Sequence, residues 1–191
     1  HGYSNGIVAY ALSEAYAMTG KMPMIKPAMD KAITNIVKGQ QAGGGFDYGY
    51  KKGDRWDLSV AAWQMQAMKA AYAAGCDVDG LQEAIAKGID FIKNTAYKNG
   101  KFGYSSPGSG SMAMTAAGTL ALQLLGEGDS SEAKNALGSM TTLVPQWRPN
   151  DFAHGASYGW YYATQAKFHG GRRHFDDWNK LFVPMLISNQ Q

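Results

Sequence analysis

The chain has 191 residues, a hydrophobic fraction of 45% and a formal net charge of +3. This length suits one globular domain with a substantial core, or a piece of a larger protein. The basic residues are scattered along the chain, which excludes a nucleic-acid groove, because such a groove needs a dense basic stripe. No apolar run approaches the roughly 18–20 residues of a membrane span, so we expect no integral membrane protein.

Cys76 is the one cysteine of the sequence, which excludes an internal disulfide and a Cys-x-x-Cys metal knuckle. The chain starts at His1, without a methionine or a signal-like apolar region. We therefore expect residues 1–191 to form a single repeat domain that is a segment of a longer chain. Any targeting signal would lie outside this segment, so the sequence leaves the compartment unknown.

Apolar and amphipathic helices are predicted to alternate along the chain. The apolar stretches cover residues 5–18, 58–72 and 112–125, and a fourth begins near Tyr158 and stops before Gly170. The amphipathic stretches that follow them cover residues 25–36, 83–92, 132–140 and 178–185. A helix that is apolar on all sides is typically buried on all sides, whereas an amphipathic helix lies at the surface. The pattern predicts enclosed inner helices covered by half-exposed outer helices.

Each apolar stretch stops at a glycine, namely Gly20, Gly75, Gly126 or Gly170. A glycine just past a helix end adopts the left-handed C-cap conformation without the penalty of a Cβ. These stops recur about every fifty residues, a period typical of repeat architectures built from stacked units. We therefore expect four helical hairpins.

Other local signals predict where helices begin and end. Asp79 with Gln82, and Asp129 with Glu132, have the spacing of a capping box that satisfies free N–H groups at a helix start. Pro184 is expected to kink or end the last helix, because proline removes a backbone donor.

The connections from an outer helix to the next inner helix are long and rich in glycine. They cover residues 39–56 and 99–111, and both contain a Gly-x-Phe-x-Tyr core, at residues 44–48 and 100–104. The first connection also carries a glutamine, Gln41, shortly before its glycines.

These turns resemble the QW-type repeat of the terpenoid cyclase and protein prenyltransferase superfamily, in which a glutamine precedes Gly-x-Trp and an inner helix follows. Residues 41–46 (QAGGGF) match with Phe46 in place of tryptophan, and the second turn keeps Gly100 and Phe102 without the glutamine. The C-terminal part from Tyr161 is similar to bacterial squalene-cyclase-like repeat proteins. The resemblance implies an all-α fold of the α/α toroid type, a partial α/α barrel of four hairpins.

The catalytic signatures of that superfamily are absent from the sequence. Its cyclases use Asp-x-Asp-Asp or Asp-Asp-x-x-Asp, and the Asp176–Asp177 pair completes neither. Its prenyltransferases bind zinc through Asp-x-Cys and a histidine, but Ala74 stands where that aspartate would precede Cys76. The Gly-Cys-Gly-Glu-Gln thioester motif is also missing. We therefore expect no metal and no cofactor.

Four residues are catalytic candidates: Asp54, Asp57, Asp151 and His154. A carboxyl group beside an enclosed aromatic cavity can have a raised pKa and act as a general acid. The alternative for Asp57 is an N-cap whose carboxylate accepts from the backbone of Ser59 and Val60. Asp151 and His154 form an acid–base pair in one interpretation and solvated loop residues in the other.

Seven further side chains are candidates for ligand binding: Trp56, Trp63, Gln64, Tyr104, Tyr158, Trp160 and Tyr161. Such aromatic rings stabilise a carbocation, stack on a sugar, or simply pack in a core. Gln64 either lines a cavity or hydrogen-bonds a neighbouring backbone. His169 and His174 are too few to form a metal site, which needs three or four convergent ligands.

The sequence indicates two alternative functions. The first is a noncatalytic binding or scaffold domain whose apolar inner surface holds a lipid-like ligand or another segment of the parent chain. The alternative is an enzyme acting on an isoprenoid or hydrolysing a glycan, with its acid from Asp54, Asp57 or Asp151. Four hairpins are fewer than a closed toroid of the superfamily contains, so the inner face needs a cover, which a homo-oligomer would also supply.

Overall fold

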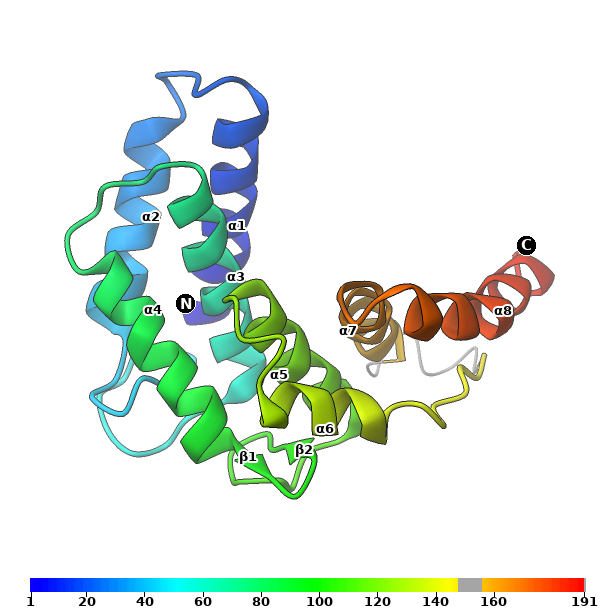
Figure 1. Ribbon diagram of the computed structural model, residues 1–191. Coiled ribbons are helices and arrows are strands. Elements are labelled where there is room, and N and C mark those ends of the chain that lie inside the picture. The colour runs from blue at the N-terminus through cyan, green and yellow to red at the C-terminus, as the bar shows by residue number, and fades with distance from the viewer. Residues whose placement is uncertain (148–155, 191) are drawn as a thin grey trace. The chain divides into compact units, whose positions relative to one another are not determined.

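The computed structural model describes residues 1–147 and 156–190. The chain divides into two compact units, residues 1–96 and 97–191 (Figure 1). Regular structure in the described residues is helical apart from one two-stranded hairpin, which confirms the all-α prediction. Each predicted helical hairpin is present as a pair of contacting helices, α1 with α2, α3 with α4, α5 with α6 and α7 with α8. The toroid arrangement stays a prediction.

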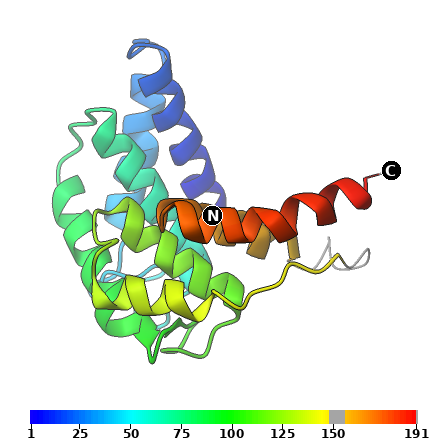
Figure 2. The same cartoon turned by 45° about the vertical axis from the view of Figure 1, so that its right-hand side comes forward.

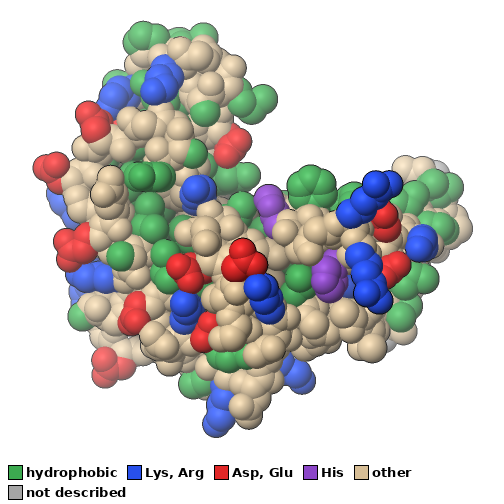
Figure 3. Space-filling model, in the orientation of Figure 1, with side chains coloured by type: hydrophobic (Ala, Val, Ile, Leu, Met, Phe, Trp, Pro, Cys, Tyr) green, Lys and Arg blue, Asp and Glu red, His purple; other side chains and the backbone are tan. Residues whose placement is uncertain are grey.

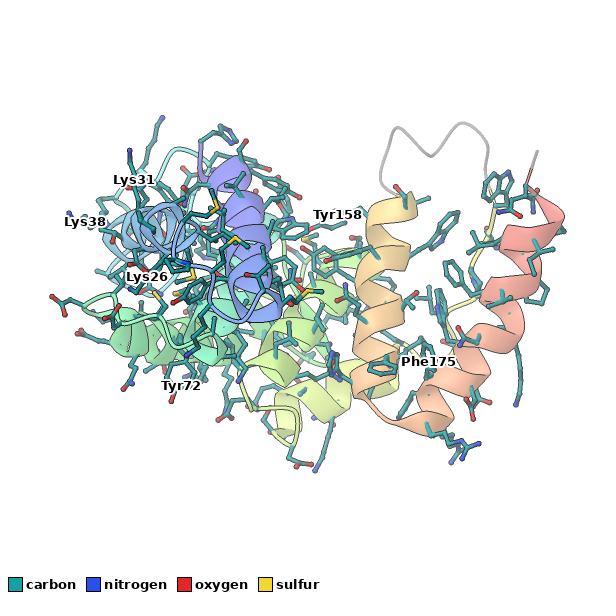
Figure 4. The ribbon with its side chains drawn as sticks, turned by 90° about the horizontal axis from the view of Figure 1, so that it is seen from above. Lys26, Lys31, Lys38, Tyr72, Tyr158 and Phe175 are labelled. Atoms are coloured by element: carbon teal, nitrogen blue, oxygen red, sulfur yellow. The ribbon has the colours of Figure 1, made fainter. Side chains whose placement is uncertain are left out.

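The first unit contains two helical hairpins and a short π-helical end. Its elements are α1 (Gly2–Met18), α2 (Lys26–Gly39), α3 (Leu58–Ala73), α4 (Leu81–Asp90) and the π-helix η1 (Phe91–Ala96). α3 contacts α1, α2 and α4, and its core side chains, such as Val60 and Met65, are fully buried. Figure 4 shows Lys31 and Lys38 projecting from α2 on the side away from α1, as expected for an outer amphipathic helix.

The second unit begins with a β-hairpin and continues with two helical hairpins. Its elements are β1 (Tyr97–Lys98), β2 (Lys101–Phe102), α5 (Met112–Leu124), α6 (Ser131–Ser139), α7 (Ala156–His169) and α8 (Arg172–Ser188). The strands are antiparallel, with Tyr97 opposite Phe102. α5 contacts α6, α7 and β2, and α8 contacts α7. Figure 2 shows the strands beside α6 at one end of this unit.

Three of the four predicted glycine stops have the same C-terminal cap. Gly20, Gly75 and Gly126 have positive φ angles of 66°, 81° and 89°. In each case the next N–H bonds a carbonyl five residues earlier, as in a Schellman motif. These bonds are Lys21 to Tyr16 at 2.8 Å, Cys76 to Ala71 at 2.9 Å and Glu127 to Leu122 at 2.8 Å. The glycine-capped repeat is therefore confirmed in the backbone of the first three hairpins.

The fourth stop does not follow this pattern. The positive φ falls on Gly171, at 101°, rather than on Gly170. A Cβ at Gly170 would lie 2.5 Å from Cδ2 of Leu137, so this glycine allows α6 and the end of α7 to approach closely. The prediction of a left-handed cap at Gly170 is wrong because packing, not backbone conformation, requires glycine there.

Two other boundary predictions are also wrong, and a third is wrong in part. The N-caps of α4 and α6 are Gly80 and Ser130, each one residue after the predicted Asp79 and Asp129. Ser130 itself caps α6 by accepting from the N–H of Ala133. Pro184 does not end α8, which continues to Ser188, and a kink at this residue stays a prediction. Proline removes only one backbone donor, and Pro184 lies exposed, where water can satisfy the carbonyl that loses its partner.

Candidate functional site

Asp57, the first of the catalytic candidates, is the N-cap of α3. Its Oδ1 accepts from the N–H of Ser59 at 2.9 Å, from the Ser59 hydroxyl at 2.5 Å and from the N–H of Val60 at 3.2 Å. The side chain is fully buried, and Oδ2 has no hydrogen-bond partner among the described residues. The N-cap interpretation is confirmed.

The other catalytic candidates do not join Asp57. Asp54 is exposed in the loop before α3. Asp151 and His154 lie outside the described residues. Within residues 1–147 and 156–190, these candidates therefore assemble no group of converging acids and bases.

The ligand-binding candidates on and before α3 have packed surroundings. Trp56 is buried, and its ring meets that of Phe91 edge-on at 5.2 Å. Trp63 is half-buried. Gln64 is fully buried, and its side-chain amide donates to the carbonyl of Gly2 at 2.9 Å. The interpretation of Gln64 as a partner of neighbouring backbone is confirmed, and its role in ligand binding stays a prediction.

Tyr50 extends the contacts of Gln64 into a network that the sequence did not predict. Its hydroxyl donates to Oε1 of Gln64 and accepts from Nδ2 of Asn5, both at 2.9 Å. Asn5 also donates to the carbonyl of Ala32 at 3.0 Å. A Cβ at Gly39 would lie 2.4 Å from the Tyr50 ring, so glycine is required beside it. The network joins α1, α2, α3 and the long loop.

Removing the Tyr50 hydroxyl is expected to change how stability depends on pH. Burial raises the pKa of Tyr50 to about 12, whereas an unfolded tyrosine titrates near about 10. The unfolded chain loses this proton first, so the free energy of unfolding falls as the pH rises from about 10 to about 12. Urea unfolding across this range should show a shallower fall for Tyr50→Phe than for the wild type. Equal slopes would contradict the assignment.

Two adjacent glutamines hold the long loop of the first unit. Nε2 of Gln41 donates to the carbonyls of Lys51 and Arg55 at 3.1 and 2.7 Å. Nε2 of Gln40 donates to the carbonyl of Gly44 at 3.0 Å and to that of Ala84 at 2.8 Å. These bonds tie distant parts of the irregular loop to one another and, through Ala84, to α4. The sequence pointed to Gln41, but Gln40, which is also buried, was missed because it lies outside the repeat pattern.

The two Gly-x-Phe turns place a buried ring in each unit. Phe46 and Phe102 are both fully buried. A Cβ at Gly118 of α5 would lie 2.3 Å from the Phe102 ring, and the N–H of Phe102 donates to the hydroxyl of Thr115 at 3.4 Å. These phenylalanines anchor the turns. Tyr104 follows its turn with 39% of its surface exposed, and its ligand-binding role stays a prediction.

The aromatic candidates of α7 contact other rings. Trp160 stacks on Trp147 with ring centroids 6.0 Å apart. Tyr158 and Tyr161 contact Tyr162 at centroid distances of 4.8 and 5.0 Å. Tyr162 is fully buried, whereas Tyr161 is 39% exposed. These contacts agree with a packing role, and the ligand-binding role stays a prediction for all three candidates.

Helix α1 is not buried on all sides, contrary to the prediction. Its exposed side carries Ile7, Val8 and Met18, which are 38%, 52% and 83% exposed, together with the exposed Glu14; we call the three apolar side chains the apolar face of α1. Figure 3 shows hydrophobic side chains on the surface over this helix. Its buried residues are mostly small: Gly2, Gly6, Ala9, Ser13 and Tyr16.

The small residues explain which side of α1 faces the core. A Cβ at Gly6 would lie 2.5 Å from Nε2 of Gln64 and 3.0 Å from Cβ of Trp63, so glycine lets α1 lie close against α3. Ile7, Val8 and Met18 consequently point outward, whereas Tyr16 stays in the core. Helical periodicity missed this because α1 is apolar on both sides.

His169 and His174 line one pocket in the second unit, together with polar and glycine residues of α5, α6 and their turn. The described residues contain no group of three or more His, Cys, Asp or Glu side chains able to hold a metal ion.

No family model, curated protein or solved structure matches the chain. The superfamily suggested by the turns therefore stays a hypothesis. Among the described helices, none combines the length and the apolar character needed to cross a membrane.

Proposed function

We propose that the chain is a noncatalytic helical-repeat scaffold of the toroid type, which binds another helical hairpin on the apolar face of α1. The observation that carries this proposal is which side of α1 faces the core. Its glycine and alanine side faces the core, while Ile7, Val8 and Met18 face outward. Exposed apolar side chains on one face of an ordered helix are typical of an interaction surface.

Comparison with α3 supports a helical partner. α1 and α3 are the apolar helices of successive hairpins, and α3 is covered by α1, α2 and α4. Among the described helices of its own unit, α1 makes its main contacts with α2 and α3. In a repeat architecture each unit buries its face against the next. A further hairpin on α1 would complete the cover that α3 already has.

The dimensions of the face suit a helix better than a lipid. From Ile7 to Met18 it extends over about 16 Å of helix, at about 1.5 Å per residue. Lipid carriage would need an apolar cavity, whereas two pockets of the first unit have charged linings, which include Asp30, Asp77 and Lys38. Full burial of an apolar side chain contributes about 1.5–3 kcal/mol, and these three side chains are already partly buried, so covering them adds roughly half of that each. The partner's other contacts must therefore offset the rest of the entropy cost of binding.

The position of Asp57 supports a noncatalytic role. A general acid must reach its substrate within hydrogen-bond distance. The Asp57 carboxyl is instead buried and accepts from the first turn of α3. An enzyme acting on an isoprenoid or a glycan would need its acid elsewhere.

Self-association tests the proposal, because each copy of the chain carries hairpins of the required kind. We expect sedimentation equilibrium to detect a weak, concentration-dependent dimer of the wild-type chain. Val8→Glu should remove it, because a charge would be desolvated in the contact. Lys31→Glu, on the exposed side of α2, is the matched control and should leave it intact.

Two results would count against a helical partner. A wild-type chain that stays monomeric at all concentrations and leaves an apolar dye unbound would show that the face attracts nothing. Native mass spectrometry after detergent-free purification would reveal a lipid, and a lipid released by Val8→Glu would replace the helical partner with lipid carriage.

A further inference from the structure

Neighbouring hairpins pack through their inner helices in both units. α3 contacts α1 in the first unit, and α7 contacts α5 in the second. In the first contact, the side chain of Gln64 on α3 donates to the carbonyl of Gly2 on α1 at 2.9 Å. In the second contact, Gln123 on α5 donates in the same way to the carbonyl of Ala166 on α7, also at 2.9 Å. Both units therefore join one inner helix to the next by the same kind of contact.

The side of α7 opposite α5 carries exposed aromatic rings. Successive residues of a helix are about 100° apart, so Tyr161 and Phe168 lie roughly opposite Ala166. These rings are 39% and 59% exposed, and the half-buried Gln165 lies between them in sequence. We call Tyr161, Gln165 and Phe168 the open side of α7. The Phe168 ring meets Phe175 of α8 edge-on at 5.2 Å, so this surface continues onto the outer helix (Figure 4).

The apolar face of α1 is open in the complementary direction. Val8 lies about 200° around α1 from Gly6, which packs against α3, just as Phe168 lies about 200° around α7 from Ala166. A preceding inner helix would therefore pack on the apolar face of α1, and a following inner helix on the open side of α7. A single contact between these two surfaces would cover both, and it would continue the order of helices that each unit already shows.

The polar groups of the two surfaces are compatible with such a contact. The open side of α7 contains no charged residue, and Glu14 is the exposed acidic residue beside the apolar face of α1. Nε2 of Gln165 donates to the Tyr161 carbonyl at 3.3 Å. A side-chain amide has two N–H donors, so the second one can donate to the Glu14 carboxylate. The contact therefore brings no like charges together at its centre.

We propose that the apolar face of α1 binds the open side of α7 in a second copy of this chain. This inference rests on the proposed function and names its partner. The contact joins two different surfaces, so it is heterologous, and each copy offers one surface of each kind.

Sedimentation equilibrium on the whole chain tests this assignment through complementation. Phe168→Glu and Val8→Glu should each weaken self-association at least about tenfold, because each places a charge in the contact. An equimolar mixture of the two variants should form a heterodimer with about the wild-type affinity. In that mixture the Val8→Glu chain supplies an intact α7, and the Phe168→Glu chain supplies an intact α1. Asn135→Glu, on the exposed side of α6, is the matched control and should associate like the wild type.

The outcomes separate this inference from the proposed function. If Val8→Glu is monomeric but Phe168→Glu associates like the wild type, α1 binds a different surface and only the present assignment is wrong. A mixture that stays monomeric would show an isologous contact and would also overturn it. A monomeric wild type would contradict both. Gln165→Glu is a milder second variant, in case Phe168→Glu does not fold by circular dichroism. It should weaken association by opposing Glu14, and unchanged association would count against the assignment.

Discussion

Gly44→Ala is expected to lower the free energy of unfolding by roughly 2–5 kcal/mol. Two effects combine at this position. Gly44 has a φ of +84°, a conformation that costs an L-residue energy, and a Cβ there would lie 2.1 Å from the carbonyl oxygen of Lys87. Backbone atoms cannot rotate away as a side chain can, so the loop and α4 would have to separate. Urea denaturation followed by circular dichroism measures the loss.

Gly43→Ala is the matched control for this prediction. A Cβ at Gly43 would meet no atom within 4 Å, and its φ is not positive. We therefore expect a change within about 1 kcal/mol, with slight stabilisation because alanine restricts the unfolded chain. Similar losses for both variants would mean that the close approach of Gly44 to α4 contributes nothing to stability.

The glycine-rich loop illustrates what a sequence can predict about the fold. The apolar helices, the amphipathic helices and three of the four glycine caps could be predicted, because they depend on periodicity and on local backbone conformation. Gly44 and Gly170 could be recognised as special, but not the reason, because their neighbours Lys87 and Leu137 come from other elements. The predicted caps at Asp79 and Asp129 were each displaced by one residue, since several adjacent polar residues compete for a helix start.

Which side of α1 faces the core could not be predicted from the sequence, for a related reason. A helix that is apolar all round contains no contrast between its faces, so the choice of the glycine side depends on the shape of α3. The direct contacts of Gly6 with Trp63 and Gln64 decide it. The apolar face of α1 follows from that choice, and with it the proposed interaction surface.

The roles of some candidate residues could be predicted from the sequence, and the roles of others could not. Asp57 and Gln64 were predicted in their structural roles, because an N-cap depends on neighbouring residues and a buried glutamine must find partners. No sequence pattern predicts the hydrogen bond between Tyr50 and Asn5. The pocket that His169 and His174 line gathers residues from two hairpins, so its lining forms only when α5, α6 and the α7–α8 junction are packed together.

Gln64→Leu is expected to lower the free energy of unfolding by roughly 1–3 kcal/mol, because it removes two hydrogen bonds from a buried site. The Tyr50 hydroxyl would lose its acceptor, and the carbonyl of Gly2 would lose its side-chain donor. Leucine nearly preserves the volume, so the loss would report hydrogen bonding rather than a cavity. Urea denaturation measures it against the wild type.

A double-mutant cycle with Tyr50→Phe separates the network from simple burial. Each single variant breaks the bond between the Tyr50 hydroxyl and Oε1 of Gln64, so the double variant should lose less than the sum of the two, with a coupling of about 0.5–3 kcal/mol. Additive losses would mean that the two side chains act independently. In that case the bond would not tie the long loop to α3, and Tyr50 would hold the loop through its other contacts, with Asn5, Phe46 and Gly39.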